Sequence, residues 1–129
     1  IDFYTDKGYK GLVIAGTGLG HVSTELYPSI ERAIEEGMTI MMTVQTLHGF
    51  TGMNVYSTGR ELLNLGIIEG RNMLPETAYI KLGWVLGQES NPEEIRALSQ
   101  KNIAGEFLPR EKPIAFTYDI DQLLKHDKL

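Results

Sequence analysis

Apolar and polar residues follow one another along the chain in blocks that are typical of an α/β protein. Continuous apolar or β-branched runs at residues 11–15 and 39–46 predict buried parallel strands, because a strand covered on both faces does not alternate. Between them, apolar residues at helical spacing predict an amphipathic helix that starts near Pro28 and stops at Gly37. These segments form a βαβ unit, whose crossover is right-handed.

One more strand and three more helices are expected downstream. Thr58 begins a stretch with capping-box spacing, which predicts a short helix over residues 58–65. Residues 67–69 predict a short third strand. Two further helices are expected at 75–88 and 91–102, each with a proline in its first turn. The predicted fold class is a three-layer α/β domain with a small parallel sheet.

The two ends of the chain carry weaker patterns. Residues 1–7 predict the last turns of a helix that stops at Gly8, and we interpret the chain as a fragment of a longer subunit. Residues 107–118 contain two prolines and predict an extended arm, and residues 119–126 predict one or two helical turns. We therefore expect a domain at 1–104 and a tail at 105–129 that packs on it or on a partner.

Composition narrows the class of protein. The 129 residues suffice for one domain with a real core, and the absence of cysteine excludes disulfides and thiolate chemistry. Acidic residues outnumber basic ones by 17 to 12, so this segment is not expected to grip a nucleic-acid backbone by itself. No apolar run approaches the roughly 20 residues that span a bilayer, and no secretory signal is visible. We expect no membrane contact and a cytoplasmic location.

The most distinctive stretch is residues 10–23 (KGLVIAGTGLGHVS), where a predicted strand runs into glycines at every second position. A dinucleotide fingerprint would need a third glycine where His21 stands, and no acidic residue ends the second strand to bind a ribose. A phosphate-binding Walker A loop is also absent. Two interpretations stay open: the glycines simply turn a strand towards a helix, or the loop supplies polar contacts to a composite site.

Other candidate chemistry is weak. The three histidines, His21, His48 and His126, lack the spacing of a metal site. Asp119 and Asp121 begin like a calcium loop, but the required glycine and terminal glutamate are missing. No nucleophilic serine elbow occurs either. The sequence therefore contains no self-sufficient catalytic constellation.

Three stretches together resemble a known family. Residues 10–23, 53–70 (MNVYSTGRELLNLGIIEG) and 73–87 (MLPETAYIKLGWVLG) resemble the C-terminal domain of the asparaginase/glutaminase type I family. Within it, the similarity is greatest to the branch formed by the D subunits of archaeal glutamyl-tRNA(Gln) amidotransferases. The resemblance implies a flavodoxin-like three-layer domain. It also implies a nucleophilic threonine in an N-terminal domain, in a T-G-G-T-type motif that does not occur here.

The resemblance further implies partners and site residues. Partners would be the chain's own N-terminal catalytic domain, a homodimer partner, and the amidotransferase E subunit, which binds Glu-tRNA(Gln). ATP and Mg²⁺ are implied only at that partner, and no cofactor in this segment. His21 stands where many asparaginases have a substrate-positioning asparagine. The implied residues line one wall of a substrate site, in some members that of the neighbouring subunit: Gly18, Leu19, Gly20, His21, Tyr56 and Ser57.

Two alternatives to an amidotransferase subunit remain. The first is the same domain from a free-standing L-asparaginase, which needs no tRNA partner. The second is an independent flavodoxin-like module that binds a small molecule. The sequence upstream of Ile1 would separate these interpretations, because an amidohydrolase requires the threonine motif there.

Overall fold

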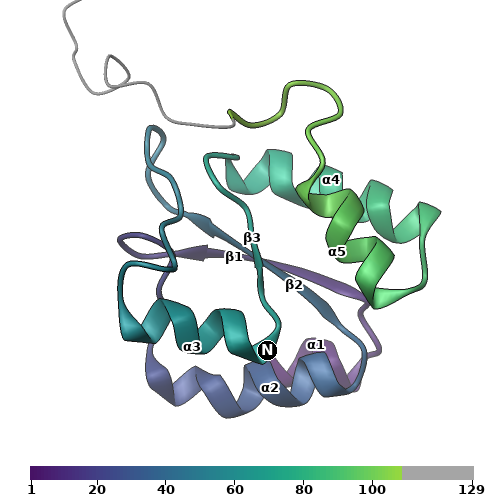
Figure 1. Cartoon of the computed structure of the whole chain (residues 1–129). Helices are drawn as coiled ribbons and strands as arrows, with labels where there is room; N and C mark the ends of the chain where they lie inside the picture. Colours follow the sequence, from purple (N-terminus) through teal and green to yellow (C-terminus); the bar gives the residue numbers. More distant parts are fainter. Residues whose placement is uncertain (109–129) are drawn as a thin grey trace, which may run out of the picture.

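Three parallel strands lie side by side between two layers of helices (Figure 1). The structure is a computed structural model that describes residues 1–108. Val13 is aligned with Met41 in one parallel pair, and Met41 with Ile68 in the other. The strands, in the order β1-β2-β3, are β1 (Gly11–Gly16), β2 (Thr39–Val44) and β3 (Ile68–Glu69). The predicted α/β fold with a small parallel sheet is confirmed.

Helices cover both faces of the sheet (Figure 1). One layer holds α1 (Asp2–Asp6), the short 3-10 helix η1 (Thr24–Leu26), α2 (Tyr27–Glu35) and α3 (Ser57–Leu65). The other layer holds α4 (Pro75–Gln88) and α5 (Pro92–Gln100). None of the helices in residues 1–108 is both long and apolar enough to cross a membrane.

The core has two halves, one on each face of the sheet. Ile40 and Met42 of β2 face the layer of α2 and α3, whereas Met41 between them faces α4 and α5. All three are buried, because successive side chains of a strand point to opposite faces and both faces are covered. This is why the second strand has a continuous apolar sequence.

Helix ends follow local signals. Asn91 caps α5: its Oδ1 accepts hydrogen bonds from the backbone N–H groups of Glu93 and Glu94, at 2.9 and 3.4 Å. Gly37 and Gly66 follow α2 and α3 with φ of +88° and +110°, the left-handed conformation that ends a helix most easily at glycine. These three signals were readable in the sequence.

Some predicted boundaries are wrong by one or two residues. Strand β2 ends at Val44, α5 ends at Gln100, and α3 begins at Ser57, so Thr58 lies inside the helix and is not its cap. Strand β1 is half-buried and Ala15 is exposed, because β1 forms one edge of the described sheet. The predicted arm and terminal helical turns lie largely or wholly outside the described residues.

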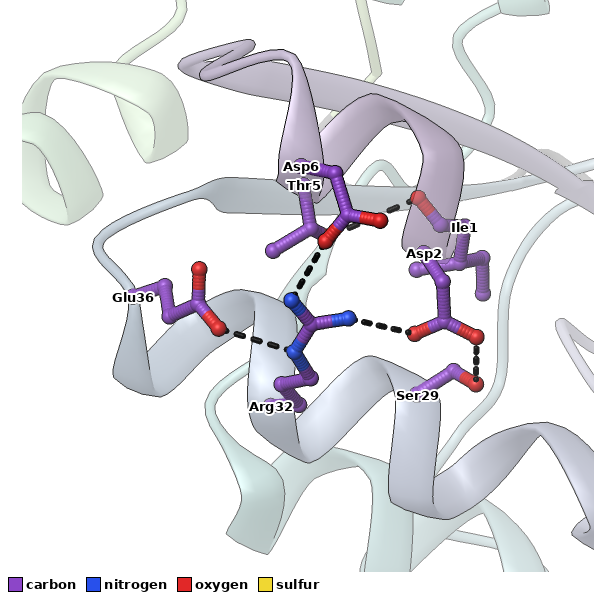
Figure 2. Close-up of polar contacts among 7 residues, drawn as sticks. All are labelled: Ile1, Asp2, Thr5, Asp6, Ser29, Arg32 and Glu36. Carbon is purple, nitrogen blue, oxygen red and sulfur yellow. Dashed lines mark hydrogen bonds and ion pairs between the residues drawn. The ribbon is translucent and has the colours of Figure 1, made fainter.

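Arg32 joins α2 to α1 (Figure 2). Its guanidinium donates to Asp6 at 2.5 Å, to Glu36 at 2.8 Å and to Asp2 at 3.3 Å. Asp2 also accepts from the Ser29 hydroxyl at 2.9 Å. The hydrogen bond to Asp6, followed by that to Glu36, raises the pKa of Arg32. These groups are exposed and individually weak, but together they hold α1 on the same face of the sheet as α2.

A buried lysine ties α4 to the segment after α5. Lys81 is 7% exposed, and its Nζ donates to the Lys101 carbonyl at 2.5 Å and to the Glu106 carboxylate. Burial alone would raise the pKa of Glu106, but hydrogen bonds from Lys81 and from backbone N–H groups at 103–104 lower it to about 2. Beside this pair, Phe107 packs into the core; it belongs to the segment from residue 105 that was predicted to pack on the domain or on a partner.

Candidate functional site

The loops after β1 and β2 meet at the carboxyl ends of the strands, where parallel α/β sheets usually hold their sites. Residues 17–23 form the first loop and residues 45–56 the second. The backbone N–H of Gly52 donates to the carbonyl of Leu19 at 2.9 Å, and the Leu19 side chain lies against Gly52. The two loops therefore form one joined surface, which we call the strand-end corner.

The first loop is a tight turn closed by backbone hydrogen bonds. Thr17 and His21 exchange two of them, N–H to carbonyl in both directions, at 2.9 Å each. Gly18 and Gly20 have φ of +54° and +96°, which side-chain-bearing residues rarely adopt. A Cβ at Gly16 would lie 2.9 Å from the backbone N and O of His21. The glycines thus allow a tight, hydrogen-bonded turn that positions His21.

His21 connects the two loops. Its Nδ1 lies 3.3 Å from the Oγ1 of Thr58, and its ring packs edge-on against Tyr56 with ring centroids 5.6 Å apart. Its Nε2 is buried and has no hydrogen-bond partner among residues 1–108. When the Thr58 hydroxyl donates to Nδ1, Nε2 carries the ring proton; in the other tautomer Nε2 is an acceptor. Either tautomer leaves Nε2 able to bind one more polar group.

Hydrogen bonds to the side chains of Glu69 and Arg60 fix the backbone of the second loop. The backbone N–H of Met53 donates to the Glu69 carboxylate at 3.0 Å. Arg60 donates to the carbonyls of residues 54 and 55 at 2.9 and 3.2 Å. A Cβ at Gly59 would overlap the Met53 carbonyl oxygen, so α3 approaches the loop as only glycine allows. These contacts fix the backbone that carries Tyr56, whereas the Tyr56 side chain itself is exposed.

The residues predicted to line a substrate site occupy this corner. Gly18, Leu19, Gly20 and His21 share the first turn, and Tyr56 reaches it through the His21 ring. Ser57 follows as the exposed first residue of α3. Their contact with a substrate stays a prediction.

Thr58 belongs to the corner and was not among the predicted site residues. Its spacing to Glu61 suggested a helix cap, whereas its hydroxyl contacts His21 across 37 positions of sequence. Its carbonyl accepts from the Tyr27 hydroxyl at 3.0 Å. Burial, and then the charge of Glu61, raises the pKa of Tyr27, so this hydroxyl remains a donor. The available signal was that Thr58 directly follows the predicted pair Tyr56 and Ser57.

The strand-end corner is better suited to packing against another protein surface than to catalysis by its own residues. Among residues 1–108, no three histidine, aspartate or glutamate side chains are placed to hold a metal ion. The hydroxyl of Thr58 and the imidazole of His21 resemble a nucleophile and a base, but no described group orients the other ring nitrogen. Leu47, Val55 and Tyr56 expose 75%, 60% and 57% of their surface nearby. Such a surface can pack against another protein surface, and the buried Nε2 of His21 keeps hydrogen-bonding capacity that no residue among 1–108 uses.

Comparison with known proteins supplies the context for this corner. The family model described as the glutaminase/asparaginase C-terminal domain matches residues 1–98. The glutamyl-tRNA(Gln) amidotransferase D subunit of Pyrococcus abyssi is 58% identical over 109 residues, 84% of this chain and 25% of that protein. The protein of the same name from Methanobrevibacter smithii is 59% identical over 107 residues, 83% of this chain and 24% of its own length. The chain therefore spans about a quarter of these relatives.

Two solved structures with the same fold are L-asparaginases. The thermostable L-asparaginase of Thermococcus kodakarensis aligns with 84% of this chain and 34% of its own, at a TM-score of 0.77 and 30% identity. L-asparaginase I of Vibrio cholerae aligns with 83% of this chain and 34% of its own, at a TM-score of 0.73 and 28% identity. In both, the matching region is a minor part of a longer chain.

Proposed function

Because the chain belongs to the glutaminase/asparaginase C-terminal domain family, we propose that it is the C-terminal domain of a glutamyl-tRNA(Gln) amidotransferase D subunit. One observation carries this proposal: identity to proteins of that name is 58% and 59%, against 30% and 28% for the L-asparaginases of similar fold. Identity of this size along 84% and 83% of the chain favours the amidotransferase over the free-standing hydrolase.

In this proposal the complete D subunit hydrolyses glutamine and supplies ammonia for converting Glu-tRNA(Gln) to Gln-tRNA(Gln). The nucleophile belongs to the N-terminal domain, and the E subunit binds the tRNA and uses ATP and Mg²⁺. The net charge of −5 supports this division, because tRNA binding calls for a basic surface. The present domain contributes to dimerisation and to one wall of the glutamine site.

The proposed wall is the strand-end corner. His21 is held by Thr58 and by the closed turn, and its Nε2 has hydrogen-bonding capacity that no residue among 1–108 uses. The exposed apolar side chains around it provide the surface on which a second protein surface would close. Because Nε2 is buried, a substrate atom, or a residue of the facing domain that contacts substrate, would complete its hydrogen bonding once the side chains that cover it move.

The test is His21→Ala in the complete D subunit with its partner. Losing one hydrogen bond at the wall should raise KM for glutamine about tenfold, since such a bond contributes about 1.4 kcal/mol. The value of kcat should change little, because the nucleophile is elsewhere. Thr58→Val should raise KM less, and Thr39→Val, at the opposite end of β2, should leave it unchanged. An unchanged KM in His21→Ala would contradict a role of His21 in glutamine binding and would leave the loop with a structural role alone.

Mixed dimers reveal whether the wall serves its own or the neighbouring protomer. Protomers carrying His21→Ala are combined with protomers in which only the nucleophilic threonine is replaced by alanine. A wall that acts across the interface restores one site with wild-type KM, because an intact nucleophile then faces an intact wall. A wall that acts within its own protomer restores none.

The L-asparaginase alternative is supported by the structural neighbours and makes a different prediction. The amidotransferase should release ammonia from glutamine efficiently only when the E subunit and Glu-tRNA(Gln) are present. A free-standing asparaginase should hydrolyse asparagine without either. Ammonia release measured with each amide, with and without partner and tRNA, separates the two.

A further inference from the structure

An apolar hollow of about 600 Å³ lies between α4 and the segment after α5. Thr77 and Trp84 line it from α4, and Ile103 lines it from the segment. Trp84 and Ile103 keep 47% and 48% of their surface exposed, although both are large apolar side chains. We call this space the α4 hollow. Filling it would remove apolar surface from water on both of its walls.

The charged residues that line the α4 hollow are already paired. Lys81 Nζ contacts the Glu106 carboxylate and also donates to the Lys101 carbonyl at 2.5 Å. Neither charge is therefore left for an ionic ligand. What the hollow offers is apolar surface, so apolar side chains are the occupant that its chemistry fits.

Hydrogen bonds fix the wall that the segment after α5 forms. The Glu106 carboxylate accepts from the backbone N–H groups of Ile103 at 3.1 Å and Ala104 at 2.7 Å. The backbone N–H of Leu108 donates to the Asn72 Oδ1 at 2.9 Å. Asn72 lies shortly before α4 begins at Pro75, so the chain beyond Leu108 starts near one end of α4, next to the hollow.

The sequence beyond Leu108 contains a segment with one apolar side. Residues 114–120 (IAFTYDI) carry a large apolar side chain at every second position. A period of two places these side chains on the same side of an extended segment. They are Ile114, Phe116, Tyr118 and Ile120.

This segment is long enough to reach the α4 hollow. Phe116 follows Leu108 by eight residues, which span up to about 28 Å when extended. Along α4, the hollow runs from Thr77 to Trp84, which is about 10 Å of helix. Because the segment starts next to the hollow, closing such a short loop costs little entropy.

We propose that residues 114–120 occupy the α4 hollow in an extended conformation, with their alternate apolar side chains packed on Trp84 and Ile103. The occupant is a segment of the same chain, because its tether holds it at a high effective concentration beside the hollow. Its apolar side meets the apolar walls, and its other side, with Thr117 and Asp119, faces solvent. This inference does not depend on the proposed function.

The fluorescence of Trp84 tests the proposal, because Trp84 is the only tryptophan among the 129 residues. Acrylamide should quench Trp84 about twofold more strongly in Phe116→Asp than in the wild type, since a carboxylate is not tolerated in an apolar hollow. Thr117→Asp changes the opposite side of the segment and should match the wild type. Far-UV circular dichroism checks that both variants keep the fold. Equal quenching of the wild type and Phe116→Asp would overturn the proposal.

Dilution separates this contact from one with a second copy. An intramolecular contact gives the same quenching at every protein concentration. Quenching that weakens as the concentration rises would assign the hollow to a second copy and would overturn the proposal.

Fluorotryptophan labelling extends the test to the complete protein, should the 129-residue chain not fold alone. The fluorine resonance of Trp84, assigned with Trp84→Phe, should shift in Phe116→Asp because an aromatic ring packed on it is lost. It should stay unshifted in Thr117→Asp. A resonance that shifts in neither variant would contradict the proposal and leave the hollow to another part of the longer protein.

Discussion

Gly16 shows how the strand-end corner depends on the absence of a single side chain. It is the last residue of β1, and a Cβ there would lie 2.7 Å from the Met42 sulfur and 2.9 Å from the His21 backbone. The backbone N and O of His21 both hydrogen-bond to Thr17, so moving either atom would break the turn that positions the His21 ring. The sequence identified this glycine as part of a loop, and the contact distances explain why it must be glycine.

At this scale we predict opposite effects for two glycines. Gly16→Ala should lower the free energy of unfolding by about 1–3 kcal/mol, as expected for overpacking against backbone. Gly83→Ala should raise it by about 1 kcal/mol in the 129-residue chain, since Gly83 lies within α4 and a Cβ would have nothing within 4 Å. Urea unfolding of both variants measures the difference. Equal effects would mean that the His21 turn yields to the added methyl group.

The contact between α4 and the segment after α5 depends on the ion pair between the buried Lys81 and the half-buried Glu106. Lysine is seldom buried, and here the carboxylate and the Lys101 carbonyl compensate for its lost hydration. The helical period of the sequence accounts for the buried side chains of Ala78, Leu82 and Val85 on α4. It could not indicate Lys81, because a polar residue on a buried face is explained only by its distant partner.

This contact predicts a pH dependence of stability. The pKa of Glu106 falls from 4.5 to about 2 on folding, so its contribution is fully present above the unfolded value and is lost as pH falls towards 2. The free energy of unfolding should therefore decrease between about pH 5 and pH 2. In Glu106→Gln the protein should be less stable at pH 7 and the decrease should be shallower, whereas Glu31→Gln on α2 should follow the wild type. If the free energy of unfolding of Glu106→Gln and of the wild type decreased with pH in parallel, Glu106 would not be the cause of the pH dependence.

At the scale of the molecule, we propose that residues 1–108 support a catalytic site to which another part of the longer protein contributes the nucleophile. Among residues 1–108, the side-chain ion pairs join α2 to α1 and α4 to the segment after α5, and the strand-end corner holds the imidazole of His21 next to the hydroxyl of Thr58. The family match and the share of each relative that is covered agree with a domain that works as part of a longer protein.

We predict that the purified 129-residue chain releases no ammonia from glutamine or asparagine. A coupled ammonia assay at high protein concentration checks this, with the complete D subunit and its partner as the positive control. Turnover that disappears in Thr58→Val would contradict the prediction and would assign the nucleophile to the Thr58–His21 pair. Turnover that persists in that variant would place it elsewhere in the chain.

Local signals along the chain were enough to predict the three strands and the α-helices of residues 1–108, but not the short 3-10 helix η1. Prolines, the Asn91 cap and the helix-ending glycines act within one turn of chain, so α4 has its predicted bounds and α2, α3 and α5 differ by a few residues. The continuous apolar runs indicated parallel strands for a similar reason: a strand that is buried on both faces has apolar residues at successive positions.

Contacts between distant residues follow only from the three-dimensional arrangement. The His21–Thr58 and Lys81–Glu106 contacts join positions 37 and 25 residues apart, and no local period encodes them. The fold also leaves β1, predicted to be fully buried, with an open side beneath exposed Tyr79 and Ile80. An apolar run indicates that a strand will be covered, but it does not say by which part of the protein. That depends on the order of the strands and on the face that each crossover takes.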